Sequence, residues 1–169
     1  RTAGFNTVDI GNLSETSLLF LCLLMFIGGG AASTAGGVKV TTVSVIYGAV
    51  ASLIRGQERV ILFEREVPRR TVYSAFILLT LSLSLVLIFS LLLRSSQSIP
   101  MIKCVFEVFS AFGTVGLSTG ITSSLDSFGK TLITILMFVG RLGPLTFLYL
   151  IAAKSYRKIK YPDESIMIG

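Results

Sequence analysis

The chain has 169 residues, of which 52% are hydrophobic and only 14% are charged. A soluble domain carries about a quarter charged residues, so this composition favours a chain whose solvent is lipid. The absence of histidine excludes His-based acid–base chemistry and His metal sites within this chain, and its two cysteines supply neither a disulfide framework nor metal-site spacing. The net charge of +6 is more typical of membrane orientation than of nucleic-acid binding.

The first predicted element is a glycine-containing turn at 1–7, followed by an apolar stretch over 16–54 whose one charge is Lys39. As one straight helix the stretch would be about 58 Å long, which exceeds a bilayer core of about 30 Å. Five glycines within 28–37 weaken a helix in its middle. The stretch is therefore either a hairpin of two short spans or one crossing that is broken in the middle. The chain opens on Arg1 rather than Met, and we expect it to continue upstream.

Three further apolar segments differ in length. The stretch 71–93 has 23 residues without a charge, and a helix of this length, about 35 Å, crosses a bilayer. The segment 103–112 is too short to span and is typical of a core helix or a re-entrant helix. A second span is predicted over 129–153, with Arg141 near its centre.

Two basic clusters orient the chain. Five arginines and three acids occupy 55–70, and four lysines and arginines lie within 154–160. Because cytoplasmic loops carry an excess of Lys and Arg, we expect the loop 55–70 and the tail 154–169 to be cytoplasmic. A solvated charged face is compatible with the same placement. The span 71–93 then runs outward, and 129–153 returns.

The sequence repeats itself at an offset of 112 positions. The offset aligns Thr2-Ala3-Gly4-Phe5-Asn6-Thr7 with Thr114-Val115-Gly116-Leu117-Ser118-Thr119. It also aligns Leu24-Met25-Phe26-Ile27-Gly28 with Leu136-Met137-Phe138-Val139-Gly140. Repeats are a common way to build transport proteins. Since both copies should lie at the same depth, 16–54 must cross once, which favours the broken helix over the hairpin.

Each unit contains an outer helix, a short re-entrant helix, a glycine-centred turn and an inner helix. Glycine at Gly4 and Gly116 allows backbone conformations that other residues resist. The carbonyl oxygens of such a turn can replace the hydration shell of a monovalent cation. The short helix would direct its negative C-terminal end toward them. A glycine-containing interfacial turn without an ion is the alternative interpretation.

Four segments resemble a known family: the turn at 1–7, the glycine-rich run at 28–37, the segment 112–120 and the segment 140–144. They are similar to the C-terminal half of Trk/Ktr/HKT potassium transporters, specifically of a bacterial Ktr membrane subunit. The resemblance implies an all-α integral membrane fold of helix–pore-helix–helix repeats. These repeats would surround a potassium-channel-like pore, with one inner helix broken by glycines.

The resemblance also divides the chain. Residues 1–70 would end a third repeat, with a filter segment, the broken inner helix, an intramembrane gate loop and the basic loop. Residues 71–153 would form a fourth repeat, and 154–169 a cytoplasmic tail. The parts of the fourth repeat would be an outer helix at 71–93, a pore helix at 103–112, a filter at 113–119 and an inner helix at 129–153.

The same resemblance implies site residues, position by position. Potassium would be bound through filter carbonyls in the segments Thr2, Ala3, Gly4, Phe5 and Thr114, Val115, Gly116, Leu117. The gate below the filter would comprise Gly28, Gly29, Gly30, Ala31, Ala32, Ser33, Thr34, Ala35, Gly36, Gly37, Lys39 and Arg141.

Three charged residues within the apolar segments need a physical explanation. A charge at mid-bilayer costs about 2.5–3.5 kcal/mol on insertion scales, so Arg141 should face a water-filled cavity or a partner. We expect its guanidinium to contact carbonyls of the glycine-rich loop and to repel cations; a structural pairing inside the bundle is the alternative. We expect Glu107 to pair with a base behind the filter in a structural role, rather than to bind the ion. Lys39 can extend its ammonium group toward water.

The resemblance implies potassium uptake across the plasma membrane by a multi-pass protein that is not an enzyme. Potassium would be the substrate, sodium dependence is left open, and no cofactor is expected in this chain. The expected partners are a second copy in a homodimer, the remaining N-terminal repeats, the lipid bilayer and a cytosolic regulatory ring that binds nucleotide, but no nucleic acid. The alternatives are a secondary transporter that binds a small solute at the broken helix and a non-transporting membrane scaffold.

Overall fold

The computed structural model describes residues 3–30, 33–57 and 59–143. Thr2, Ala31, Ala32, the end of the expected inner helix and the expected tail at 154–169 lie outside these residues. The described chain is mostly helical. Its elements are the 3-10 helix η1 (Ile10–Asn12), α1 (Glu15–Phe26), α2 (Val40–Ile54), β1 (Ile61–Leu62), β2 (Arg65–Glu66), α3 (Arg69–Ser96), α4 (Met101–Phe112), the 3-10 helix η2 (Ile121–Ser124) and α5 (Ser127–Leu142).

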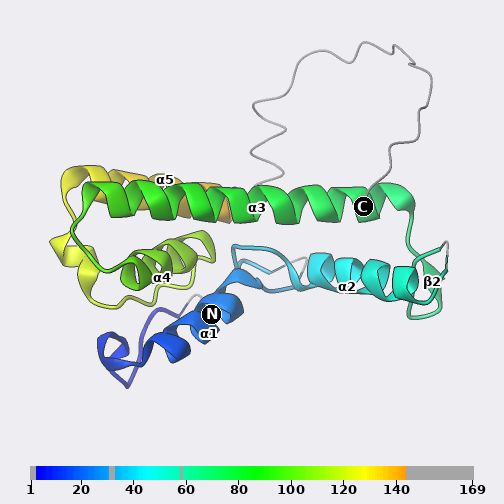
Figure 1. Ribbon diagram of the computed structural model, residues 1–169, viewed down its shortest axis with the longest axis horizontal. Coiled ribbons are helices and arrows are strands. Elements are labelled where there is room, and N and C mark those ends of the chain that lie inside the picture. Colours follow the sequence, from blue (N-terminus) through cyan, green and yellow to red (C-terminus); the bar gives the residue numbers. More distant parts are fainter. Residues whose placement is uncertain (1–2, 31–32, 58, 144–169) are drawn as a thin grey trace, which may run out of the picture.

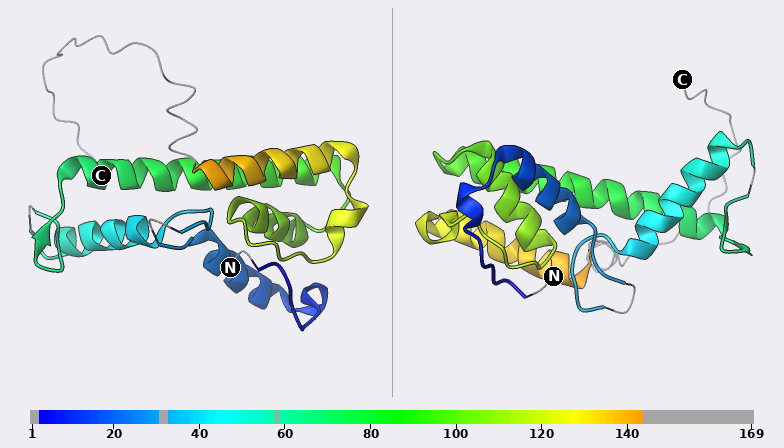
Figure 2. Two further views of the ribbon diagram at one scale, coloured as in Figure 1. Left: turned by 180° about the vertical axis from the view of Figure 1, so that it is seen from behind. Right: turned by 90° about the horizontal axis from the view of Figure 1, so that it is seen from below.

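The long helix α3 organises the other helices (Figure 1). Both α2 and α4 lie along the same side of α3, one after the other, and α5 runs beside α3 (Figures 1 and 2). The N-terminal helix α1 packs on α4. The loop between α1 and α2 therefore falls between α2 and α4, near the middle of the molecule.

Of the helices that the structure describes, α3 alone is long and apolar enough to cross a membrane. Its 28 residues extend for about 42 Å and enclose the expected outer helix at 71–93. The face toward the other helices carries Ala75, Ser82, Val86, Ser90 and Leu93. Small residues on this face allow close approach of neighbouring helices in a lipid environment. The two buried serine hydroxyls donate to the backbone carbonyls four residues earlier, so neither remains unsatisfied.

The apolar stretch after residue 15 forms two helices rather than one. Helix α1 has 12 residues and α2 has 15, so each is too short to span a bilayer by itself. The chain between them leaves the helix at Ile27 and returns at Lys39. Three backbone hydrogen bonds join the ends of this excursion. The amide of Val38 donates to the carbonyl of Phe26 at 3.1 Å, that of Val40 to Gly29 at 3.2 Å, and that of Gly28 to Val38 at 2.5 Å. The interruption is therefore a closed loop (residues 27–39), which we call the intramembrane loop after the position that the sequence analysis expects for it.

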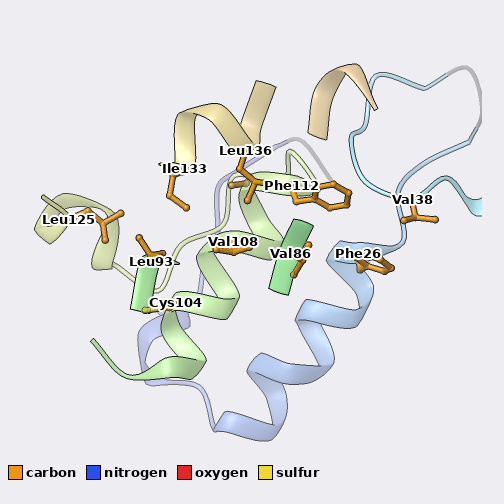
Figure 3. Packing of buried hydrophobic residues seen from close by; sticks show 11 residues of the cluster. Phe26, Val38, Val86, Leu93, Cys104, Val108, Phe112, Leu125, Ile133 and Leu136 are labelled. Carbon is orange, nitrogen blue, oxygen red and sulfur yellow. The ribbon is translucent and has the colours of Figure 1, made fainter. Parts of the chain in front are cut away.

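A buried apolar cluster joins α1, the intramembrane loop, α3, α4 and α5 (Figure 3). Phe26 at the end of α1 lies between two rings of α4. The centroid of its ring is 6.0 Å from the ring centroid of Phe112, in a stacked arrangement, and 5.8 Å from that of Phe109, in an edge-to-face arrangement. Val38 from the loop and Leu136 from α5 complete this part of the core. The end of the loop is thereby packed against the end of α4.

The offset of 112 residues also relates elements of the structure. Ser14 caps α1 by accepting from the amide of Ser17, and Asp126 caps α5 by accepting from the amide of Gly129. A 3-10 helix precedes each cap, and a glycine with positive φ precedes each 3-10 helix, Gly4 at 72° and Gly116 at 89°. The copies diverge where α1 ends at Phe26, because α5 continues as far as Leu142.

A small antiparallel hairpin lies within the basic loop 55–70, where the sequence predicted only a loop. Strand β1 pairs with β2 across Phe63 and Glu64, which both have positive φ values. Arg59 and Glu66 form an ion pair at 3.1 Å, with both side chains largely exposed. An exposed pair of this kind contributes little to stability. The two-residue strands are a minor departure from the all-α expectation.

Candidate functional site

The C-terminal end of α4 determines the shape of the second glycine turn. The amide of Thr114 donates to the carbonyl of Ala111 at 3.1 Å, and the amide of Val115 donates to Ser110 at 2.9 Å. This pair of bonds is a Schellman helix end, whose left-handed position is usually glycine. Here Thr114 occupies that position with φ of 51°. A β-branched residue in this conformation costs about 1–2 kcal/mol, so the position is strained.

The structure brings the two glycine turns together. A Cβ atom placed on Gly116 would lie 2.9 Å from the Cα atom of Gly4. A Cβ atom placed on Gly4 would lie 3.3 Å from the carbonyl oxygen of Gly116. Both glycines are exposed and have positive φ values, so each position requires glycine for conformation as well as for space. Segments more than 100 residues apart thus place bare backbone side by side.

A cavity of about 500 Å³ adjoins these turns. It extends from Gly4 and Gly116 past Thr114 to Arg141. Its wall also includes Ala3, Glu107, Ser110, Ala111, Val115, Leu117, Ser118, Thr122, Ile133 and Met137. Of the expected filter residues, Ala3, Gly4, Thr114, Val115, Gly116 and Leu117 therefore line one space. Phe5 is 81% exposed and is absent from this lining.

Val115 anchors the second turn through its side chain. It is buried in a cluster with Ile10, Leu18, Met25 and Phe106. The side chain points into this core, so the polar groups that the turn offers to the cavity are those of its backbone and of Thr114. A filter built from main-chain oxygens needs such an anchor, because the backbone must be held without using the carbonyls.

Glu107 holds the chain that follows the second turn. Glu107 is 5% exposed, and its carboxylate accepts from the hydroxyl of Ser118, from the amide of Thr119 at 3.0 Å and from the hydroxyl of Thr122 at 3.1 Å. The sequence predicted a basic partner. Within the described residues, however, its hydrogen-bond partners are hydroxyls and an amide, and the ion pair that is found joins Arg59 and Glu66. Several donors can stabilise a buried carboxylate without a cation.

We predict that Glu107→Ala lowers the free energy of unfolding by about 2 kcal/mol or more, because the buried amide of Thr119 and the hydroxyls of Ser118 and Thr122 lose their acceptor. Glu107→Gln keeps the shape and one acceptor, so about 1 kcal/mol is expected. Thermal unfolding of the full-length protein in detergent measures both values. Glu15→Gln, at an exposed first-turn position, is the matched control and should change little. Equal effects at the two glutamates would contradict the assigned role of Glu107.

Two cations bind consecutive carbonyls of the intramembrane loop. The guanidinium of Arg141 donates to the carbonyl of Thr34 at 2.6 Å. The ammonium group of Lys39 donates to the carbonyls of Ser33, at 3.1 Å, and Ala35. Lys39 therefore folds back onto the loop instead of extending toward water. Three successive main-chain oxygens that could bind a free cation are already occupied by side-chain cations of the same chain.

The loop also inserts closely between α4 and α5. A Cβ atom on Gly36 would lie 2.9 Å from the carbonyl oxygens of Gly140 and Phe112, and 2.7 Å from the methyl group of Thr114. The amide of Gly36 donates to the hydroxyl of Thr114 at 2.8 Å. Gly36 is needed here for close approach, since any side chain would push the loop away from both helices.

Comparison with known proteins identifies the family. The model of the TrkH family, described as cation transport protein, matches residues 1–159. The chain belongs to this family. The TrkH match agrees with the expected resemblance and, together with the apolar helix α3, makes the chain part of a membrane protein.

Curated relatives of this TrkH family chain carry names that refer to potassium uptake. The chain is 42% identical over 169 residues to Ktr system potassium uptake protein B of Bacillus subtilis, and 41% identical over 170 residues to Ktr system potassium uptake protein D of the same organism. It is 38% identical over 176 residues to the potassium/sodium uptake protein NtpJ of Enterococcus hirae. Each match covers all of this chain but only 38–39% of the relative, so the chain spans about two fifths of their length.

Sequence reasoning identified most positions around the cavity but missed several of the contacts that hold them. It assigned Thr114 only a carbonyl role, whereas its hydroxyl also accepts from Gly36. It did not identify Ser118 and Thr122 as partners of Glu107. A signal for the latter was present, because three hydroxyl residues follow the glycine turn at Ser118, Thr119 and Thr122. The expected gate residues Ala31 and Ala32, and the filter residue Thr2, lie outside the described residues.

Proposed function

We propose that this chain supplies two of the repeats that surround a potassium pore in a transporter of the plasma membrane. The proposal rests chiefly on one observation: Gly4 and Gly116 adjoin each other and border a cavity that also contains Arg141. Carbonyl oxygens of the two turns would replace the water around a dehydrated potassium ion. The names of the relatives support potassium as the transported ion. The remaining repeats come from the rest of the protein.

The intramembrane loop is the gate of this pore in our proposal. It lies against the last turn of α4 and is bound through its carbonyls by Arg141 and Lys39. A cation fixed at this depth raises the electrostatic barrier to a second cation, and the backbone of the loop closes the passage sterically. Opening requires the loop to leave Arg141. The activity is transport, and no reaction of an enzyme is involved.

The proposal also assigns a role to the two basic segments of the chain. The basic loop 55–70 and the tail 154–169 face the cytoplasm and form the surfaces for a second copy of the subunit and for a nucleotide-binding regulatory ring. The nucleotide binds to the ring rather than to this chain. Sodium dependence is compatible with the relative that is named for both potassium and sodium uptake. The described part of the basic loop is rich in arginine and carries the exposed hairpin β1–β2, which is accessible to a partner.

Complementation of a potassium-uptake-deficient bacterial strain tests the proposed function. The full-length protein should restore growth at low external potassium and should take up rubidium as a tracer. Growth that stays deficient despite normal membrane expression would contradict the proposal. Uptake of an organic solute without rubidium uptake would instead support a secondary transporter with its site at the broken helix.

A further inference from the structure

Thr114 combines two features that are not explained by a filter carbonyl alone. It holds the left-handed position at the end of α4, where glycine would be free of strain, yet the residue is β-branched. Its side chain is half-buried and contacts the intramembrane loop rather than lying free in the cavity. A strained residue at such a place persists when its side chain has a role that glycine cannot fulfil.

The side chain of Thr114 binds the intramembrane loop at Gly36. The amide of Gly36 donates to the hydroxyl oxygen of Thr114 at 2.8 Å, and the two residues are 78 positions apart. The methyl group of Thr114 faces the same glycine, whose missing side chain leaves just enough room. Without Thr114, the Gly36 amide would lose its partner at a partly buried position. The filter turn thus holds the loop by one polar bond and one apolar contact.

Thr114 also lines the cavity beside Gly116. An ion in the cavity beside Thr114 and the amide of Gly36 would compete for the hydroxyl oxygen of Thr114. When the loop is bound, this oxygen accepts from Gly36. If an ion binds this oxygen, the loop loses its hydrogen bond to Thr114. If the loop keeps the hydrogen bond, the ion loses this oxygen as a ligand. The two events are coupled, and such coupling acts equally in both directions.

We propose that Thr114 is a latch, that is, a residue whose hydroxyl joins the filter turn to the intramembrane loop. Potassium in the inner part of the filter then weakens the binding of the loop to α4. This inference rests on the proposed function, since it assumes that the cavity holds the ion. It differs from the contact of Arg141, which holds the loop from α5 at the carbonyl of Thr34 and does not belong to the filter turn. Thr114 acts here as a positioning residue for the loop.

A cysteine reporter on the loop tests the latch in the full-length protein reconstituted in liposomes. Ala35→Cys places the reporter beside Gly36 at a buried position, and the native Cys22 and Cys104 are buried as well. Its rate of modification by a small water-soluble thiol reagent is compared with that of the protein lacking the reporter. In the otherwise unchanged protein, replacing choline by potassium should increase the rate.

Variants of Thr114 in the reporter background decide the role of the hydroxyl. Thr114→Val removes the hydroxyl and keeps the shape, so modification should be about fivefold faster even in choline, because one neutral hydrogen bond is lost. Thr114→Ala should also increase the modification rate, and it replaces the valine variant in the test if that variant does not fold. Thr114→Ser retains the hydroxyl and loses only the methyl contact, so its rate should lie closer to that of the parent than to that of the valine variant. Rates in the valine and alanine variants equal to the parent, or a serine variant as fast as valine, would overturn the latch.

The outcome is separable from that of the proposed function. Rubidium uptake by the parent protein tests the pore, whereas the reporter tests only the bond between Thr114 and the loop. Normal rubidium uptake with a reporter that does not respond to Thr114 would remove the latch and leave the pore intact.

Discussion

Replacing Arg141 with alanine is expected to increase potassium flux through the closed transporter by about ten- to hundredfold. The guanidinium donates to the carbonyl of Thr34 at 2.6 Å, and a hydrogen bond to a charged group contributes about 1.5–3 kcal/mol. Because about 1.4 kcal/mol corresponds to a factor of ten, its loss shifts the loop by that amount toward the open position. The electrostatic barrier inside the cavity is removed at the same time. Rubidium influx into liposomes, without an activating partner, measures the change.

Two controls separate this effect from a general loss of an arginine. Arg94→Ala removes a guanidinium that also donates to a backbone carbonyl, that of Gln97 at 2.9 Å, but at the end of α3 and outside the lining of the cavity. Its influx should remain at the level of the parent. Arg141→Lys keeps the positive charge but loses the planar guanidinium group with its several N–H donors, so an intermediate influx is expected. Unchanged influx in Arg141→Ala, with normal expression, would contradict a gating role for this residue.

Gly116→Ser is expected to reduce the preference for potassium over sodium by about tenfold or more. A non-glycine residue with φ near 89° costs about 1–2 kcal/mol, and its Cβ atom would lie 2.9 Å from the Cα atom of Gly4. Both effects move the carbonyl oxygens that must match a dehydrated ion. Competition of sodium with rubidium uptake, compared between parent and variant, measures the preference.

Gly120→Ser is a matched control for this substitution. Gly120 has the same φ of 89°, but nothing lies within 4 Å of the Cβ atom that serine would add. The control therefore carries the backbone strain without the collision at Gly4. It should destabilise the protein slightly and leave the ion preference intact. A preference that stays intact in Gly116→Ser, or falls equally in both variants, would argue against a filter at Gly116.

Regular elements with strong local signals were predictable from the sequence. The uncharged run 71–93 lies within α3, and the glycine-rich middle of 16–54 coincides with the interruption between α1 and α2. These signals work because helix length and glycine content are local properties of the chain. The repeat added long-range information, since it aligned Gly4 with Gly116 before their proximity in space was known.

Contacts between distant residues were harder to predict. The left-handed conformation of Thr114 contradicts its intrinsic preference, and its hydroxyl accepts from the amide of Gly36, which lies 78 positions away. The hairpin at Phe63 and Glu64 lacks the Gly, Asn or Asp residues that normally indicate such a turn. Glu107 was assigned a basic partner because charge pairing is the simplest compensation for a buried carboxylate. Hydroxyl donors fulfil the same role, but their geometry cannot be read from composition.

Anomalous diffraction from crystals of the full-length protein soaked in rubidium tests most directly whether the two glycine turns bind an ion together. We expect a rubidium peak between the turns at Gly4 and Gly116, within ligand distance of main-chain oxygens from both, and lost in potassium-free choline. A map with no peak there, or with these two glycines far apart and facing hydrocarbon, would contradict a shared filter.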